Sequence, residues 1–295
     1  EVKWELSNVD IKDDQNRVIF VQKGSEYPVF FSPNARSVVS SRYAYGEMGT
    51  SERETSLRPI IQRVGETYGK QAVAHGYFDE TAARVFTDEL AKLTLMQMVS
   101  FNSPVWFNVG TDRYPSRQNS QKSDIYHVDE NGVAVQTQPQ ESHLYPQTSA
   151  CFIQSVEDTM EDIMDLSRRE AMLFKYGSGT GTDLSTLRSS REKLSGGGKP
   201  SGPIAYERFF DNVAGIVKSG GKTRRAAKMN TLKDWHPDIR EFIVAKGEEE
   251  KKAKALVKQG YTARVASETG AYQNVNLSVR VSDEFMRAVE NDEEW

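Results

Sequence analysis

From residue 149 onward, short apolar strands alternate with amphipathic helices. Strands are predicted near 149–153, 228–232 and 274–281, and helices over 158–176 and 204–217. Strands and helices that alternate in this way are typical of α/β folds built on a parallel sheet. With 295 residues, the chain is long enough to bury a substantial core in one or two domains.

The first part of the chain has a different pattern. Apolar and polar residues alternate over 1–35, which predicts a strand hairpin, and helical spacing follows over 56–68 and 79–99. Residues rich in Gln, Ser, Asp and Pro then predict an exposed loop region. We therefore expect three parts: an N-terminal arm and helical region (1–110), the loop region (111–148) and an α/β domain (149–295).

Composition excludes several classes of function. The net charge of −4 offers no basic field for a nucleic-acid partner. The sequence shows no signal-peptide pattern and no run of 18 apolar residues, so we expect a cytoplasmic protein without a membrane partner. The four histidines show no ligand spacing and there is one cysteine, so we expect no metal site in this chain.

Cys151 follows a polar loop and begins an apolar strand. Free cysteine often packs in a core as a small hydrophobic residue. A thiol at the mouth of a sheet can instead act in redox chemistry, and this one would form a disulfide only with another polypeptide. The residue alone leaves both interpretations open.

Glycines alternate through 177–181, a pattern that superficially suggests a dinucleotide-binding loop. That motif requires a strand before it and a helix after it, whereas here a helix precedes it. A helix end followed by a tight turn is the simpler interpretation.

A basic segment at 219–228 contains two glycines and four cations in an otherwise acidic chain. Arginine side chains and backbone N–H groups suit phosphate, and the glycine loop 196–198 followed by Lys199 favours a nucleotide site between two loops. A solvated basic loop is the alternative. Similarly, Ser103 before Pro104 is either a helix stop or a phosphate contact.

At these residues the chain resembles class II ribonucleotide reductases, and the resemblance covers nearly its whole length. The segments that carry it are 42–54, Phe101–Asn108, Ser149–Ile153, Phe174–Gly181, Leu187–Ser190, Ser195–Gly198, 218–229, His236–Ile239 and 276–285.

The resemblance implies a fold and a reaction. The fold is a helical N-terminal region plus the first half of a ten-stranded α/β barrel. The reaction is reduction of the ribose 2′-carbon by thiyl-radical chemistry, with the radical generated by adenosylcobalamin and the electrons supplied by a cysteine pair.

The resemblance also implies residue roles. Cys151 matches the first cysteine of the reducing pair. Ser103 matches a contact to substrate phosphate, and Ser149, Ala150 and Gly179 match positions beside the ribose. The positions that match the site for allosteric dNTP or ATP effectors are Asp158, Thr159, Met160, Arg188, Lys199, Lys222, Arg224 and Arg225. The helix 158–176 resembles the family's dimer-contact helices, so we expect a dimer.

Some of the family's features are missing from these 295 residues. The radical cysteine of the Asn-x-Cys-x-Glu loop, the second redox cysteine and the C-terminal cysteine pair are absent. We therefore expect a split or truncated reductase, which needs a complementary C-terminal chain and reaches a thioredoxin-type reductant through it. The alternatives are a non-catalytic dNTP-binding regulatory subunit or fragment, and half of a class I large subunit.

Overall fold

The computed structural model describes residues 2–13, 15–119, 125–217 and 226–295. The chain divides into two compact units, Glu1–Ser149 and Ala150–Trp295. Each unit is described by itself below. Among the described residues, no helix combines the length and apolar character needed to cross a membrane.

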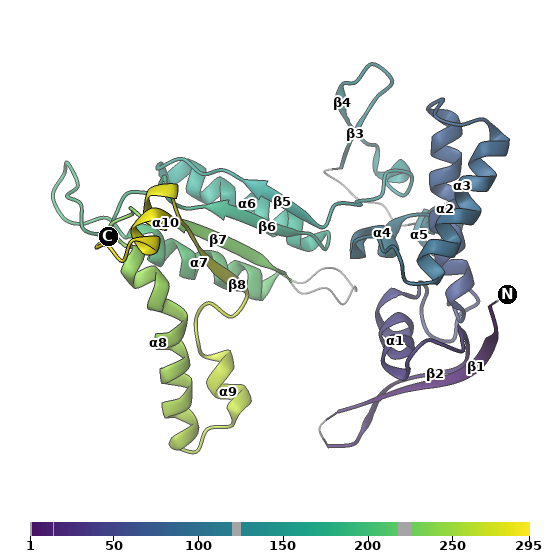
Figure 1. Cartoon of the computed structure of the whole chain (residues 1–295), viewed down its shortest axis with the longest axis horizontal. Coiled ribbons are helices and arrows are strands. Elements are labelled where there is room, and N and C mark those ends of the chain that lie inside the picture. The colour runs from purple at the N-terminus through teal and green to yellow at the C-terminus, as the bar shows by residue number, and fades with distance from the viewer. Residues whose placement is uncertain (1, 14, 120–124, 218–225) are drawn as a thin grey trace. The chain divides into compact units, whose positions relative to one another are not determined.

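The first unit joins a β-hairpin to a group of helices (Figure 1). Its antiparallel strands pair Trp4 with Pro28 and Ile11 with Phe20, which confirms the predicted hairpin. The main elements are β1 (Trp4–Lys12), β2 (Val18–Pro28), α1 (Pro33–Val38), α2 (Leu57–Ala74), α3 (Glu80–Leu95) and α4 (Ser103–Asn108). The predicted helices 56–68 and 79–99 are confirmed as α2 and α3, although α2 continues six residues beyond the predicted end.

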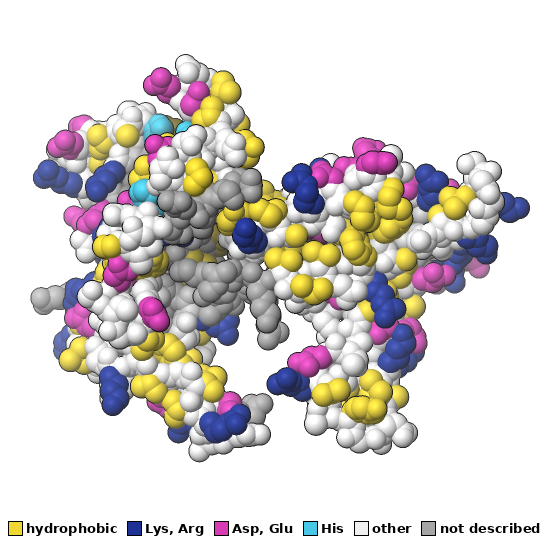
Figure 2. Space-filling view, turned by 180° about the vertical axis from the view of Figure 1, so that it is seen from behind, with side chains coloured by type: hydrophobic (Ala, Val, Ile, Leu, Met, Phe, Trp, Pro, Cys, Tyr) yellow, Lys and Arg dark blue, Asp and Glu magenta, His cyan; other side chains and the backbone are white. Residues whose placement is uncertain are grey.

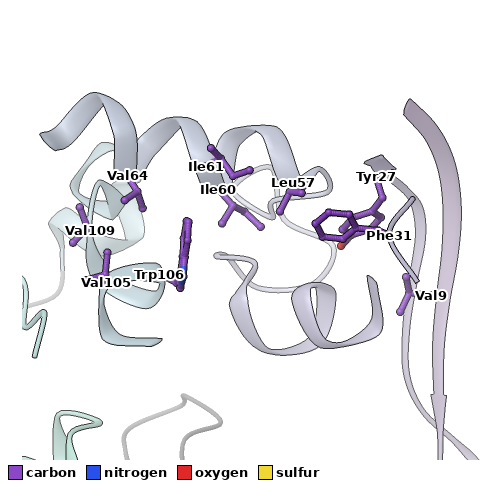
Figure 3. Packing of buried hydrophobic residues seen from close by; sticks show 10 residues of the cluster. All are labelled: Val9, Tyr27, Phe31, Leu57, Ile60, Ile61, Val64, Val105, Trp106 and Val109. Carbon is purple, nitrogen blue, oxygen red and sulfur yellow. The ribbon is translucent and has the colours of Figure 1, made fainter. Parts of the chain in front are cut away.

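Ten buried hydrophobic residues form the core of the first unit (Figure 3). They come from the hairpin, the segment after it, α2 and the α4 region: Val9, Tyr27, Phe31, Leu57, Ile60, Ile61, Val64, Val105, Trp106 and Val109. The helix stripe that predicted α2 is therefore its buried face.

The region 111–148 is more structured than its composition suggested. It contains α5 (Pro115–Gln118), a short hairpin of β3 (Tyr126–Val128) and β4 (Ala134–Gln136), and two short 3-10 turns. The stacked rings of His127 and Tyr145, with centroids 3.9 Å apart, pack this hairpin against the following segment. The expectation of a plain loop is corrected here, because local strand pairing and ring stacking order part of it.

The second unit is built on a parallel sheet. Its strands are β5 (Cys151–Gln154), β6 (Gly179–Asp183), β7 (Lys228–Lys233) and β8 (Val275–Arg280), in that order across the sheet. Since every neighbour is also the next strand in sequence, right-handed crossovers place the connecting helices on one face. This is the α/β architecture that the sequence predicted, and four parallel strands are consistent with part of a barrel.

Three helices cover one face of this sheet: α6 (Met160–Lys175), α7 (Gly202–Ile216) and α8 (Ile239–Lys258). The short helix α9 (Ala263–Glu268) packs against α8, and α10 (Asp283–Glu290) follows β8. Leu166 of α6, Phe210 of α7 and Phe242 of α8 are buried in one cluster with Leu232 of β7. Because side chains alternate along a strand, the opposite face carries the residues between those that face the helices.

One prediction for this unit was partly wrong. A helix end and a tight turn were expected over 177–181, and Gly177, with φ 87°, does follow the end of α6. From Gly179 onward, however, the chain forms β6, because strands on both sides provide backbone partners for it.

Candidate active site

Cys151 is an exposed free thiol at the start of β5. The parallel register places it opposite Gly179 of β6. The Gly179 N–H donates to the carbonyl oxygen of Ala150, at 2.7 Å. The structure thus brings together three of the predicted site residues: Ala150, Cys151 and Gly179.

Gly179 is a glycine because the space around it is filled. A Cβ atom built there would lie 2.8 Å from the carbonyl oxygen of Ala227 and 3.4 Å from the Cys151 sulfur. At Gly181 the nearest atom to a built Cβ is 3.9 Å away. The glycine spacing that indicated a turn therefore reflects one close approach inside a sheet.

The thiol lies on the face of the sheet that the helices leave open. Ile153 follows Cys151 on that face and is 94% exposed, and Met229 of β7 is in register with Gly181 beside it. The face therefore presents a thiol, glycine backbone and apolar side chains. A ligand can approach the backbone closely at Gly181, where a built Cβ would meet no atom nearer than 3.9 Å.

Ser149 and Ser103 belong to the first unit. The side chain of Gln147 accepts from the Ser149 N–H and donates to its carbonyl oxygen, at 2.6 and 2.8 Å. The Ser103 hydroxyl lies 3.1 Å from the phenol oxygen of Tyr43. Ser103 begins α4, with Asn102 as its cap, so the interpretation of Ser103-Pro104 as a helix stop was wrong.

The predicted effector residues Asp158 and Arg188 form a pair. Arg188 donates to the Asp158 carboxylate through Nε at 2.5 Å and through its backbone N–H at 3.2 Å. Thr159 caps α6 by accepting from the Asp162 N–H, and the next residue, Met160, is 58% exposed. A cation, a helix N-terminus and an exposed apolar side chain therefore lie at one end of α6.

The other predicted effector cations are Lys199 and three residues of the basic segment. Lys199 is exposed and follows the glycine loop. Lys222, Arg224 and Arg225 lie outside the described residues.

Asp238 was not predicted as a site residue, yet it anchors the loop after Arg188. Its buried carboxylate accepts from the Ser189 hydroxyl at 2.7 Å and from the Ser190 N–H at 2.9 Å. Burial alone would raise the pKa of Asp238, but the hydrogen bonds from Ser190 and Ser189 hold that pKa below its ordinary value. Its position next to Pro237 carried no signal for this role, because the serines are 48 residues away or more in sequence.

Charged side chains of both signs are interspersed on the visible surface (Figure 2). Within the described residues, no group of three or more His, Cys, Asp or Glu side chains is arranged to hold a metal ion. The residues brought together by the sheet define the candidate site, which is the open face around Cys151. The Asp158–Arg188 pair is a separate feature of the same unit.

Comparison with known proteins shows the family of the chain. Residues 149–295 match the family "Ribonucleotide reductase, barrel domain". The vitamin B12-dependent ribonucleotide reductase of Rhodopirellula baltica is 51% identical over 298 residues, covering 99% of this chain and 28% of that protein. The enzyme of the same name from Streptomyces clavuligerus is 45% identical, with the same two coverages.

The chain belongs to the ribonucleotide reductase family, and its second unit is part of the barrel domain of that family. Within the family, its relatives are the vitamin B12-dependent, or class II, reductases, so it corresponds to a portion of a class II chain. It spans about 28% of the length of these relatives.

Proposed function

We propose that this chain forms part of a ribonucleotide reductase and supplies one cysteine of its reducing pair. The observation that carries the proposal is the position of Cys151. It is an exposed thiol beside Gly179 on the uncovered face of a parallel sheet that matches the reductase barrel domain.

The redox balance requires a second thiol from outside these 295 residues. Reduction of the ribose 2′-carbon consumes two electrons and two protons and releases the 2′-hydroxyl as water. Two thiols supply both as they become a disulfide, and Cys151 is the single cysteine present. The thiyl radical that activates the 3′-position likewise belongs to a cysteine outside this chain.

The residues around Cys151 have positioning roles in this proposal. Gly179 lies opposite the thiol through the strand register, while Ala150 and Ser149 precede it in sequence. Ser103 is proposed to contact substrate phosphate through its hydroxyl.

The proposed cofactor is adenosylcobalamin, because the names of the relatives state that they depend on vitamin B12. The face around Cys151 carries the apolar side chains of Ile153 and Met229, and we assign neither of them to the cofactor. We therefore propose the cofactor for the assembled enzyme and assign none of its steps to residues of this chain.

The end of α6 is proposed to bind a dNTP or ATP effector. Asp158, Thr159 and Met160 would form one wall, and Arg188, Lys199, Lys222, Arg224 and Arg225 would supply cations for phosphate. Asp158 accepts a hydrogen bond from the Arg188 guanidinium, so an effector phosphate would compete with Asp158 for it.

Binding of dNTPs to the chain tests the effector site. Arg188→Ala should weaken binding by about 10-fold or more, since a hydrogen bond to a charged group is worth about 1.5–3 kcal/mol. Arg264→Ala, at an exposed position of α9, should leave the affinity unchanged. Equal affinities for wild type and Arg188→Ala would remove Arg188 from the proposed site.

The second thiol must come from another part of the enzyme. We therefore propose a complementary reductase segment or chain as a partner, and a thioredoxin-type reductant that acts through it. From the resemblance of α6 to the family's dimer-contact helices, we also propose a dimer that forms along α6. The 295-residue chain alone should form no deoxyribonucleotide with adenosylcobalamin and dithiothreitol, because one thiol supplies half of the electrons. Turnover by this chain alone would overturn the proposal.

A further inference from the structure

A buried polar layer lies beneath the sheet, on the face opposite Cys151. Glu170 of α6 pairs with Lys228 of β7, and both side chains are fully buried. The hydroxyls of Thr180 and Thr182 on β6 donate to the same Glu170 oxygen, at 3.0 and 3.4 Å. One carboxylate therefore links a helix to two neighbouring strands.

A second carboxyl group extends this layer. Glu207 of α7 is 1% exposed and accepts a hydrogen bond from the side-chain amide of Asn230 on β7. The Lys228 ammonium also lies over the Phe210 ring, 4.5 Å from its centroid, and it is the one cation among these groups. The Lys228 charge can neutralise one of the two carboxylates.

Three buried oxygens in this layer have no hydrogen-bond partner among the described residues: Glu170 Oε2, Glu207 Oε1 and Asn230 Oδ1. All three are acceptors when both carboxyl groups are ionised, so none can satisfy another. Leaving a buried polar atom unpaired is costly. A single proton on Glu207 would turn one of these acceptors into a donor and remove the uncompensated charge.

We propose that Glu207 holds a proton in the folded chain and that the layer formed by Glu170, Thr180, Lys228, Glu207 and Asn230 positions the strands that carry the thiol site. This role rests on the proposed function of Cys151.

The surroundings of Glu207 favour its neutral form. Burial, helped by the negative charges of Glu170 and Asp211, raises its pKa to about 7 against the hydrogen bond from Asn230 and the charge of Lys228. Asp211, on the same helix, is satisfied by the backbone N–H groups of Tyr272 and Asn274, at 2.8 and 2.7 Å. Burial raises the pKa of the Tyr272 phenol, and the negative charge of Glu207 acts on that group in the same direction.

The layer acts on the thiol face through alternation along the strands. Thr180 directly follows Gly179, and Lys228 directly follows Ala227, whose oxygen restricts the space at Gly179. The Thr180 N–H donates to that same Ala227 oxygen, at 3.0 Å. A shift of the polar layer by a few tenths of an ångström therefore changes the gap beside Cys151.

Cys151 is itself a suitable reporter, because it is the only thiol in the chain. We would measure its alkylation by iodoacetamide from about pH 6 to about pH 8.5 in the wild-type chain and in Glu207→Gln. Glutamine has the shape and charge of the protonated acid and can donate to Glu170 or Asn230. The ratio of the two rates cancels the pH dependence of the thiol itself.

The proposal predicts equal rates at about pH 6 and a wild-type rate at least about twofold higher at about pH 8.5, since loss of the proton loosens the layer. Glu290→Gln, at an exposed position of α10, should match the wild type throughout. A rate ratio that does not change with pH would overturn the proposal, because a merely structural glutamate would change the rates equally at every pH.

If Glu207→Gln does not fold, infrared titration of the wild-type chain tests the protonation of Glu207 independently. It should show one carboxylic acid that ionises near neutral pH, and full ionisation of all carboxyl groups by about pH 6 would overturn the proposal. Neither measurement uses nucleotide or cofactor. Their failure would leave the reductase proposal standing, and failure of the reductase proposal would not alter their outcome.

Discussion

Gly179 and Gly181 occupy alternate positions of β6 and point to the same face of the sheet. Only Gly179 lies against a backbone oxygen that cannot easily move. The difference makes the two positions a matched pair for testing the geometry beside Cys151.

Gly179→Ala should destabilise the second unit by about 1–3 kcal/mol, as overpacking in a well-filled interior does. Gly181→Ala should have little effect, because its Cβ would make an ordinary contact at 3.9 Å. Urea unfolding of both variants measures the difference. Equal stability of the two variants would show that the approach of Ala227 to Gly179 does not constrain the strand.

Glu207 should make the free energy of unfolding of the second unit fall as the pH rises, because its pKa is raised on folding. Its pKa rises from an ordinary 4.5 in the unfolded chain to about 7 in the folded chain. The stabilisation from binding the proton is complete below pH 4.5 and is lost as the pH rises through about 7.

Relative to Glu207→Gln, the wild type should lose about 2–3 kcal/mol of unfolding free energy between about pH 5 and about pH 8. Urea unfolding at several pH values measures this. Parallel stability curves for the two proteins would contradict the proton assignment.

Residue type alone drew attention to Cys151, the single cysteine, whereas Gly179 and Arg188 were singled out by the family resemblance. The structure places Cys151 opposite Gly179 across a sheet, and the roles of all three remain predictions. The partners of Arg188 and Lys228 could not be predicted, because they lie 30 and 58 residues away and nothing local specifies them. Glu170 and Glu207 were missed because their partners, Lys228 and Asn230, lie on a strand distant in sequence.

Elements with strong periodicity were predicted well, and elements defined by tertiary contacts were not. The helices α2, α3, α6 and α7 were predicted from their apolar spacing, and side-chain caps begin three of them: Ser56 of α2, Asp79 of α3 and Thr159 of α6. The strand β6 consists of glycine, threonine and aspartate and has no apolar pattern of its own. It forms a strand because β5 and β7 pair with it on both sides. Its glycine spacing therefore indicated a turn.

The first unit depends on a buried ion pair between elements. Arg63 of α2 donates to Glu54 at 2.8 Å and to the carbonyl oxygens of Val109 and Trp106, at 2.6 and 2.5 Å. Both charged side chains are almost completely buried. One guanidinium thus connects α2 to the segment before it and to the end of α4.

Arg63→Met should destabilise the first unit by about 3–5 kcal/mol, because it leaves the Glu54 charge buried without its partner. Arg84→Met, at an exposed position of α3, should change stability by no more than about 0.5 kcal/mol. Thermal unfolding of both variants measures the contrast. A small effect of Arg63→Met would mean that water or Tyr114, which donates to Glu54 at 2.9 Å, compensates the charge.

At the scale of the whole molecule, the chain joins two compact units and spans about 28% of its B12-dependent relatives. The α/β architecture of the second unit was predicted from the alternation of helices and strands, and it matches the reductase barrel domain. The proposed chemistry needs thiols from the remainder of the enzyme, so activity is a property of the complete assembly.

Turnover of the complete enzyme with Cys151→Ser tests most directly whether this chain supplies half of the reducing pair. With adenosylcobalamin, a ribonucleotide and a dithiol, the wild-type assembly should form deoxyribonucleotide continuously. The variant should lose multiple turnover, because serine cannot form the disulfide, while it keeps its effector affinity. Continuous turnover by Cys151→Ser at the wild-type rate would contradict the assignment of Cys151.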